Sequence, residues 1–211
     1  MNNYIEHTLL RADATVEDII RLCEEAKEYG FCGVCINPVY VGLASNMLAR
    51  TGIKTVAVVG FPLGASVTAV KELEARLAVE EHADEIDMVM NIAAAKCGEW
   101  QAVEDDIRAV VAAADGQSVK VIFEASLLTD DEKRRACQVA VDAGARFVKT
   151  STGFGGGGAT VDDVRLMKEV VGDKAQVKAA GGIRTRQLAE ELTAAGATRL
   201  GTSSGVAIVK G

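Results

Sequence analysis

Phe147-Val148-Lys149-Thr150-Ser151-Thr152-Gly153 is an apolar run that ends on a lysine just before a glycine loop. A lysine in this position extends from the end of a buried strand into a site. One structural unit later, Val177-Lys178-Ala179-Ala180-Gly181-Gly182 repeats the arrangement. Two amines held close together cannot both stay charged easily, and the one that loses its proton is a nucleophile toward carbonyl groups. The two runs therefore predict paired strands and Schiff-base chemistry.

Apolar runs of this kind alternate with amphipathic, helix-like segments along most of the chain. Seven runs are predicted strands, at residues 33–37, 55–61, 85–90, 119–125, 146–150, 176–180 and 199–201, and a short run at 4–6 makes an eighth. Each is too short and too rich in β-branched residues for a helix. Because one helix separates each run from the next, the strands must pair in parallel through right-handed crossovers.

Eight parallel strands with helices between them favour an α/β fold in which residues 1–211 form a single (β/α)8 TIM barrel domain. A doubly wound open sheet is the alternative. Against it, no G-x-G-x-x-G motif follows the first strand, and the polar residues are spread over many strand ends instead of one switch point.

Threonines followed three residues later by an acidic residue predict capped helix starts. The pairs are Thr15 with Asp18, Thr129 with Glu132 and Thr160 with Asp163.

The composition is that of an ordinary globular protein, with 211 residues, 49% hydrophobic and 25% charged. Because the net charge is −7 and no basic run occurs, a nucleic-acid or anionic-membrane surface is not expected. The N-terminus lacks a signal core and no run approaches the roughly 20 apolar residues of a membrane span, so we expect a cytoplasmic protein. The five cysteines fit reduced thiols. Cys32 and Cys35 have the C-x-x-C redox spacing, but an offset of three along a strand sends them to opposite faces.

Four charged residues are expected on four neighbouring strands. Asp87, Glu124, Lys149 and Lys178 each stand in or at the end of a predicted strand. In a barrel the strand ends ring the C-terminal mouth, where the active sites of this fold lie. If the strands that carry Lys149 and Lys178 are neighbours, the backbones at these two residues lie about 4.8 Å apart. Asp87 is placed to balance the remaining ammonium charge or to move a proton through a water.

Two glycine-containing loops predict a phosphate site. Gly181 and Gly182 precede a helix expected to start near Thr185, and Gly201-Thr202-Ser203-Ser204-Gly205 follows the last strand. Barrels hold phosphate with backbone N–H groups in the loops after strands seven and eight, and Arg184 adds a charged donor. The glycine-rich run 153–158 is interpreted either as a mobile cover of the site or as a plain flexible loop.

No metal site is predicted. The chain has two histidines, His7 and His82, and no H-x-H, H-E-x-x-H or paired cysteine-histidine spacing. We therefore expect a metal-independent mechanism.

Five motifs together resemble the 2-deoxyribose-5-phosphate aldolase family of class I aldolases: GFPLGA, EIDMVMNI, FVKTSTGFGGGGAT, VKAAGGIRT and GTSSG. The resemblance runs nearly from end to end. It implies a (β/α)8 barrel that reversibly condenses acetaldehyde with glyceraldehyde 3-phosphate without metal or cofactor. It also implies a role in deoxyribose phosphate catabolism and a homo-oligomer, commonly a dimer or a tetramer.

By this resemblance Lys149 is the Schiff-base lysine, Lys178 is the neighbour that lowers its pKa, and Asp87 is the acid/base that works with water. Cys35 matches a cysteine that aldehydes attack in some members. The implied phosphate contacts are Gly153, Gly181, Gly182, Arg184, Ser203 and Ser204.

Three features depart from the family pattern. Glu6 stands where the family often has aspartate, which keeps the charge on a longer side chain. The sequence ends at Val209-Lys210-Gly211, where several members continue into a mobile tail with a tyrosine that assists proton transfer. Phe154 stands where some members have a lysine, which bears on phosphate affinity.

Two other functions stay open at this point. Another Schiff-base barrel, such as a transaldolase-like enzyme or a fructose-phosphate aldolase, would use the same lysine. A phosphate-binding barrel without catalysis would need only the glycine loops, with both lysines as anion ligands.

Overall fold

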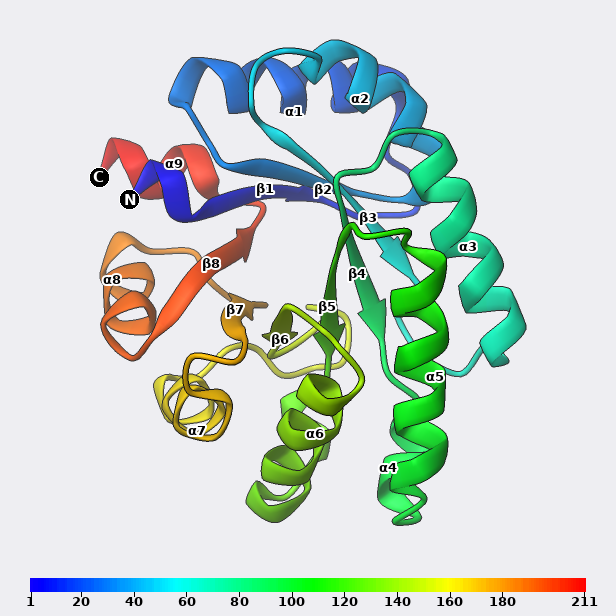
Figure 1. The fold of residues 1–211 in the computed structure, drawn as a ribbon. Helices are drawn as coiled ribbons and strands as arrows, with labels where there is room; N and C mark the ends of the chain where they lie inside the picture. The colour runs from blue at the N-terminus through cyan, green and yellow to red at the C-terminus, as the bar shows by residue number, and fades with distance from the viewer.

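The computed structural model describes all residues from 1 to 211, and its eight parallel strands form one closed barrel (Figure 1). Each strand pairs with its neighbours in sequence, and β1 pairs with β8 to close the ring. The predicted (β/α)8 fold is confirmed. The doubly wound alternative is wrong, because an open sheet has edge strands that pair on one side only, whereas every strand here pairs on both sides. The strands are β1 (Ile5–Leu9), β2 (Gly33–Ile36), β3 (Lys54–Val59), β4 (Glu85–Val89), β5 (Ser118–Ile122), β6 (Phe147–Lys149), β7 (Gln176–Ala180) and β8 (Ala197–Thr202).

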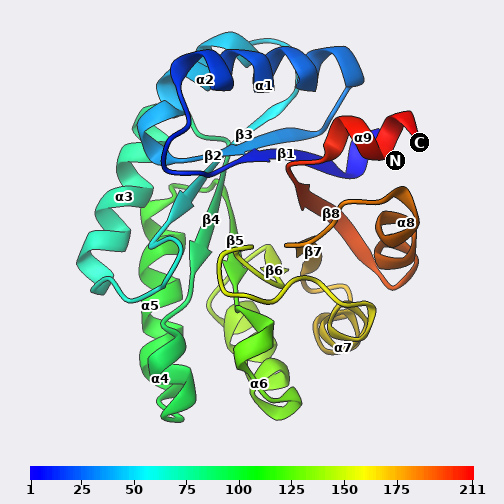
Figure 2. The same ribbon diagram turned by 180° about the vertical axis from the view of Figure 1, so that it is seen from behind.

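Helices connect the strands and surround the barrel. Figures 1 and 2 show them outside the ring on all sides, with the two chain ends close together beside the last helix. The α-helices are α1 (Val16–Tyr29), α2 (Val41–Leu48), α3 (Thr68–Glu80), α4 (Ile92–Lys96), α5 (Trp100–Ala113), α6 (Asp130–Asp142), α7 (Val161–Val171), α8 (Arg186–Ala194) and α9 (Gly205–Lys210). Short 3-10 helices are η1 (Asn2–Tyr4), η2 (Pro38–Tyr40) and η3 (Ala125–Leu127).

All eight predicted strands are present, and the first shows the clearest difference in its bounds. The prediction of 4–6 starts too early and ends too soon, because Tyr4 belongs to η1 and β1 continues to Leu9. The polar residues of β1 explain the error. Glu6 is fully buried inside the barrel and Thr8 lines a cavity at its mouth, so both are strand residues that face a polar interior.

Two of the three predicted capping boxes form. Thr15 and Thr129 each accept a hydrogen bond from the backbone N–H three residues on, and the acidic residue there accepts one from the threonine N–H in return. At Thr160 the box is incomplete. Its hydroxyl accepts from the N–H of Asp163, but the Asp163 carboxylate accepts from the Thr160 hydroxyl instead of the backbone. The helix α7 still begins directly after Thr160.

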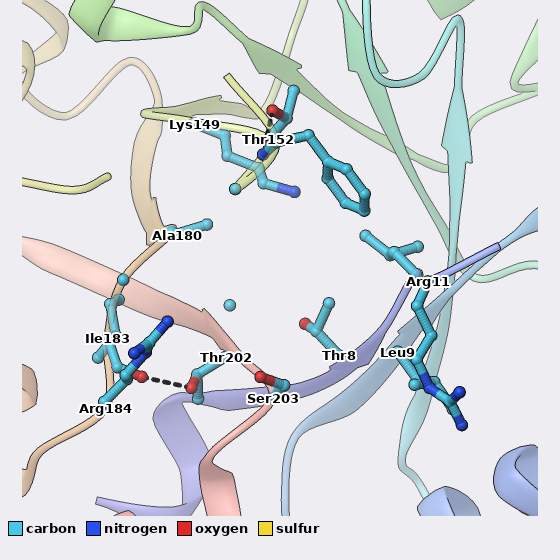
Figure 3. Close-up of a pocket in the computed structure, with 16 residues that line it drawn as sticks. Thr8, Leu9, Arg11, Lys149, Thr152, Ala180, Ile183, Arg184, Thr202 and Ser203 are labelled. Carbon is cyan, nitrogen blue, oxygen red and sulfur yellow. Dashed lines mark hydrogen bonds between the residues drawn. The ribbon is translucent and has the colours of Figure 1, made fainter. Parts of the chain in front are cut away.

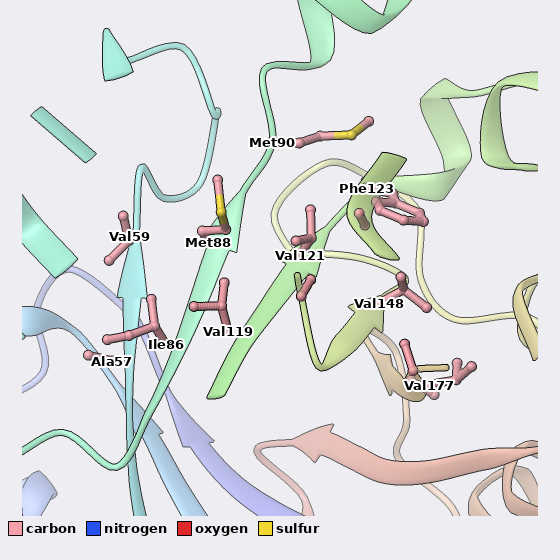
Figure 4. Packing of buried hydrophobic residues seen from close by; sticks show 14 of the residues in the cluster. Ala57, Val59, Ile86, Met88, Met90, Val119, Val121, Phe123, Val148 and Val177 are labelled. Atoms are coloured by element: carbon pink, nitrogen blue, oxygen red, sulfur yellow. The ribbon is translucent and has the colours of Figure 1, made fainter. Parts of the chain in front are cut away.

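The main hydrophobic core lies between the barrel and its helices. Its 49 buried residues come mainly from the outer faces of the strands and the inner faces of the helices. Figure 4 shows this layer at β3 to β7, where side chains such as Ile86, Val121 and Val177 pack together. A separate cluster of four apolar residues, which includes Cys35 and Val58, lies on the opposite strand face, inside the barrel. Much of the remaining interior is charged, which gives the barrel its chemistry.

The five cysteines are free thiols. The sulfur of Cys35 on β2 lies inside the barrel, 3.8 Å from Oδ2 of Asp87. Cys32 lies just before β2. The alternation of side chains along a strand, from which opposite faces were predicted for Cys32 and Cys35, therefore does not apply to Cys32. Its sulfur instead accepts a hydrogen bond from the guanidinium of Arg199 at 3.2 Å.

None of the helices has both the length and the apolar character that a membrane span requires. The cytoplasmic location expected from the sequence stays a prediction.

Candidate active site

Lys149 and Lys178 lie side by side on neighbouring strands. They are direct cross-strand partners in the register of β6 and β7. Both are buried, with 2% and 0% of their surfaces exposed. Their Nζ atoms donate to the same oxygen, Oδ2 of Asp87, at 2.6 and 2.7 Å. The predicted proximity of the two amines is therefore confirmed.

Asp87 belongs to a network of ion pairs inside the barrel. Nζ of Lys120 lies 3.0 Å from Oδ1 of Asp87. Glu6 links Lys178 to Arg199, since its carboxylate bonds to the lysine and lies 3.6 Å from the guanidinium. The network consists of three carboxylates and four cations: Glu6, Glu85, Asp87, Lys120, Lys149, Lys178 and Arg199.

The charges of this network fix the protonation of Asp87 and Lys178. Burial disfavours the Asp87 carboxylate, but the three lysines around it outweigh this effect and hold its pKa well below the ordinary value. Burial also disfavours the Lys178 ammonium, but the carboxylates of Asp87 and Glu6 raise its pKa well above the ordinary value. At neutral pH Asp87 is therefore a carboxylate and Lys178 an ammonium ion.

Lys149 is the member of the network that determines its net charge. The other six members are three carboxylates and three cations, which balance. An uncompensated charge is costly to bury in a protein interior. Lys149 is thus the one member of the network for which no carboxylate remains to balance a charge.

A cavity of about 300 Å³ opens at the C-terminal mouth of the barrel. Sixteen residues line it, from β1, β6, β7 and β8 and the loops after them (Figure 3). Lys149 is the only lysine among them, and Figure 3 shows its amine directed into the cavity. Lys178 and Asp87 are fully buried and do not line the cavity. The cavity therefore presents one nucleophilic amine to a ligand.

Most residues of the predicted phosphate site line the same cavity. The lining includes Gly153, Gly181, Gly182, Arg184 and Ser203. Ser204 lies outside the lining, and its backbone N–H donates to the hydroxyl of Thr202 at 2.9 Å. Thr202 donates in turn to the carbonyl oxygen of Ile183 at 2.6 Å, which joins the loop after β8 to the loop after β7. In Figure 3 these joined loops form a wall of the cavity opposite Lys149.

The glycine run 153–158 packs tightly against neighbouring segments. A Cβ atom at Gly155 would lie 2.5 Å from the carboxyl carbon of Glu124, and one at Gly158 would lie 2.5 Å from the carbonyl oxygen of Gly181. Glu124 also accepts hydrogen bonds from the backbone N–H and the hydroxyl of Thr152. Neither Gly155 nor Gly158 has room for a side chain, and these contacts place the run beside the cavity.

A comparison with protein families now bears directly on this site. The family model described as DeoC/LacD family aldolase matches residues 3–211. The chain belongs to the DeoC/LacD family of aldolases. The resemblance seen in the five sequence motifs is thereby confirmed, and the protein is a lyase.

Relatives of this aldolase match it over nearly its whole length. A deoxyribose-phosphate aldolase from Carboxydothermus hydrogenoformans is 59% identical over 211 residues, covering 98% of this chain and 92% of the relative. A deoxyribose-phosphate aldolase from Deinococcus radiodurans is 58% identical over 209 residues, covering 99% and 95%. Among solved structures, the tetrameric deoxyribose phosphate aldolase from Aeropyrum pernix has a TM-score of 0.93 and 35% identity, over 99% of this chain and 89% of that one.

Phe154 forms part of the cavity lining in this aldolase. Its ring meets that of Phe61 edge to face, with centroids 5.4 Å apart, and 56% of the residue stays exposed. At the position where some family members have a lysine, the lining thus offers an aromatic surface and no cation.

Three charged members of the aldolase network, Glu85, Lys120 and Arg199, were not predicted from the sequence. Lys120 stands between Val119 and Val121 in β5. In a strand that alternates, a charge between two valines faces the side opposite to them, which in a barrel surrounded by helices is the interior. This pattern is the signal that would have identified Lys120 beforehand.

Glu6, Cys35 and Asp87 place three potential metal ligands within 4.8 Å of one another. Their surroundings do not suit a cation. Both carboxylates already pair with the Lys178 ammonium, whose charge repels a metal ion. Burial raises the pKa of the Cys35 thiol to about 11, which disfavours the thiolate that binds a metal ion.

Proposed function

We propose that this aldolase reversibly cleaves 2-deoxy-D-ribose 5-phosphate to acetaldehyde and D-glyceraldehyde 3-phosphate through a Schiff base on Lys149, in the breakdown of deoxyribose phosphates. Relatives at 59% and 58% identity carry the name deoxyribose-phosphate aldolase. The observation that carries the proposal is the position of Lys149. It alone belongs both to the buried ion network and to the cavity lined by the glycine loops.

The proposed reaction begins with the neutral amine of Lys149. Its nitrogen attacks C1 of the open-chain sugar phosphate, the carbonyl oxygen takes up a proton, and the carbinolamine loses water to give a protonated imine. Loss of the C3 hydroxyl proton then breaks the C2–C3 bond, and its electrons move into the imine. Glyceraldehyde 3-phosphate leaves, and an enamine stays on Lys149. Protonation at C2 and addition of water release acetaldehyde and restore the amine.

Asp87 is proposed to transfer the protons, beside the charge of Lys178. Asp87 accepts a hydrogen bond from Nζ of Lys149 at 2.6 Å, so it is placed to exchange protons with the imine through a water. Lys178 provides a fixed positive charge beside the amine. None of these steps needs a metal or a cofactor, because the protonated imine is itself the electron sink.

The phosphate group is proposed to bind the wall formed by the loops after β7 and β8. Backbone N–H groups at Gly181, Gly182 and Ser203 lie there, close to the N-terminus of α8. Arg184 adds a positive side chain. In a chain with a net charge of −7, such local donors must supply the attraction for a dianion. Gly153, in the loop after β6, is the remaining predicted contact that lines the cavity. Ser204 does not line it, and its hydrogen bond to Thr202 positions the loop that carries Ser203.

We also propose that the aldolase forms a homo-oligomer. The structurally similar aldolase from Aeropyrum pernix is described as a tetramer. Light scattering of the purified protein at several concentrations tests this proposal, and a monomer at all of them would contradict it.

Trapping of the imine tests the proposed chemistry. The protein is incubated with acetaldehyde, reduced with borohydride and digested, and the N-ethyl group is located by peptide mass spectrometry. We expect rapid labelling of Lys149 and none at this position in Lys149→Ala. Lys174→Ala, which removes an exposed lysine, is the matched control and should label normally. Absence of an adduct on Lys149 would refute the Schiff base and favour a barrel that only binds phosphate.

Substrate assays separate this proposal from another Schiff-base aldolase. Cleavage of 2-deoxyribose 5-phosphate should release acetaldehyde, whereas fructose phosphates, whose carbonyl is at C2, should not be cleaved. A preference for fructose phosphates would retain the imine and overturn the proposed substrate.

A further inference from the structure

A second cavity lies at the opposite, N-terminal mouth of the barrel, and no step of the proposed reaction uses it. It measures about 500 Å³. Its ten lining residues come mainly from the segments that lead into β1, β2 and β3, with one residue from β8. The cavity is therefore separate from the site around Lys149.

Every charged side chain in this lining is cationic. Lys27, Lys54 and Arg199 line the cavity, and no carboxylate does. This is unusual for a chain whose net charge is −7. Lys27 makes no ion pair, and the one partner of Lys54 is Asp84, at 3.3 Å and outside the lining. The side-chain amide of Asn3 adds a further donor.

Arg199 has hydrogen-bond donors without partners. Only 19% of its side chain is exposed. Its guanidinium carries five N–H donors, yet it makes one hydrogen bond, to the sulfur of Cys32 at 3.2 Å. Its ion pairs to Glu6 and Glu85, at 3.6 Å each, balance its charge but are too long for hydrogen bonds and leave N–H donors free. A largely buried guanidinium with free donors at a cavity is a group that an anion would satisfy.

We propose that this second cavity binds a small phosphate-bearing anion, and that its occupancy is transmitted to Lys178 through Arg199 and Glu6. Two lysines supply point charges and the arginine supplies a planar fork of donors, a combination that suits the oxygens of a phosphate group. The volume is in the range of small-molecule sites.

The transmission follows from the shared position of Glu6. Its carboxylate bonds to Lys178 and lies 3.6 Å from Arg199. An anion in the cavity draws the guanidinium toward itself, which leaves Glu6 more strongly engaged with Lys178. The ammonium group is then held further from Asp87, so we expect occupancy to lower the rate of the reaction.

Calorimetric titration of the full-length protein with inorganic phosphate at low salt tests the binding. We expect two phosphates per wild-type chain, one at each mouth. Ser203→Glu should remove the C-terminal site, and the double variant Lys27→Met, Lys54→Met should weaken the other by about tenfold or more. Lys174→Met removes an exposed lysine outside the lining and is the matched control. A parallel titration with malonate should show weaker binding, and equal affinity would overturn the assignment of phosphate.

The remaining outcomes separate this proposal from the proposed function. If the double variant still bound two phosphates with unchanged affinity, binding in the second cavity would be refuted. The same would follow if the wild type bound one phosphate and Ser203→Glu abolished that binding. A single wild-type site lost only in the double variant would support the second cavity and contradict the phosphate site proposed for the reaction.

The transmission rests on the proposed function and is tested with unphosphorylated 2-deoxyribose at saturation. Phosphate should lower kcat of the wild type and leave kcat of the double variant unchanged. An unchanged kcat in the wild type under conditions where calorimetry shows binding would overturn the transmission and leave the binding site intact.

Discussion

Lys149 and Lys178 donate to a single oxygen atom, Oδ2 of Asp87, from two neighbouring strands. The two amines therefore compete for one acceptor. Asp87 also pairs with Lys120 through its other oxygen, while Glu6 holds Lys178 from a second direction. The negative charge of Asp87 is thus shared among three amines.

Replacement of Lys178 should make this carboxylate pair with Lys149 more strongly. We expect Lys178→Met to slow adduct formation between acetaldehyde and Lys149 by about 100-fold at pH 7, because Asp87 Oδ2 is then no longer shared and holds the Lys149 amine more tightly. The rate of borohydride-trapped adduct, measured against pH, should lie below that of the wild type. Lys133→Met removes another partly buried lysine and should keep the wild-type profile. Equal profiles for Lys178→Met and the wild type would contradict the assigned role.

Removal of the charge of Asp87 should destabilise the fold. We expect Asp87→Asn to lower the free energy of unfolding by about 3–5 kcal/mol at pH 7, because lysine charges stay buried without a full partner. Urea unfolding measures this loss, with the fully exposed Asp173→Asn as the control.

The pH dependence of that loss follows from the two shifted pKa values. Since folding lowers the pKa of Asp87, its stabilisation is present above about pH 3.9 and is lost as pH falls through the folded value. Since folding raises the pKa of Lys178, its stabilisation is present below about pH 10.4 and is lost as pH rises through the folded value. The difference between variant and wild type should therefore be constant from about pH 5 to pH 9. A difference that changes severalfold within this window would refute the assigned charges.

The contact between Gly158 and Gly181 should determine the position of the cavity wall that is proposed to bind phosphate. A Cβ atom at Gly158 would collide with the Gly181 carbonyl oxygen, so Gly158→Ala must push the two loops apart. We expect KM for 2-deoxyribose 5-phosphate to rise about tenfold, with a smaller effect on unphosphorylated 2-deoxyribose. Gly156→Asn is the control, because the space there is open and asparagine tolerates its positive φ. Equal effects on both substrates would show that the contact does not act through phosphate.

Cys35 should react slowly with electrophiles. Burial raises the pKa of this thiol to about 11, whereas Cys97 is exposed. With iodoacetamide at pH 7.5 we expect modification of Cys35 to be at least about 100-fold slower than that of Cys97, as followed by peptide mass spectrometry. Cys97→Ser should remove the fast label and leave the slow one. Similar rates for the two cysteines would show that the barrel opens readily.

The sequence predicted the barrel because its strands and helices alternate with regular punctuation. It also predicted the proximity of Lys149 and Lys178, since both lie at equivalent points of consecutive strands. Arg199 could not be placed in the same way. Its pairing with Glu6 joins β8 to β1, and that contact exists only because the ring closes. Local patterns report which face a side chain occupies, but not which distant side chain it meets.

The residues proposed to bind phosphate could be placed in the right loops from the sequence, but their positions at the cavity could not be predicted one by one. The loops after β7 and β8 meet at one cavity, as the fold requires. Ser203 lines that cavity and Ser204 does not, although the two are adjacent in the sequence. The hydrogen bond from the Ser204 N–H to Thr202 sets the turn that separates them, and a serine pair alone does not reveal such a turn.

Glu6 and Lys178 are bonded across 172 positions of sequence, and the barrel closes only when β8 meets β1. On the ribosome, nearly the whole chain must therefore emerge before these charges can leave water. Until that moment Glu6 cannot pair with Lys178, and the nascent chain has no assembled site. Dehydration of the network is thus expected to be one of the last events of synthesis, which confines the chemistry of Lys149 to completed molecules.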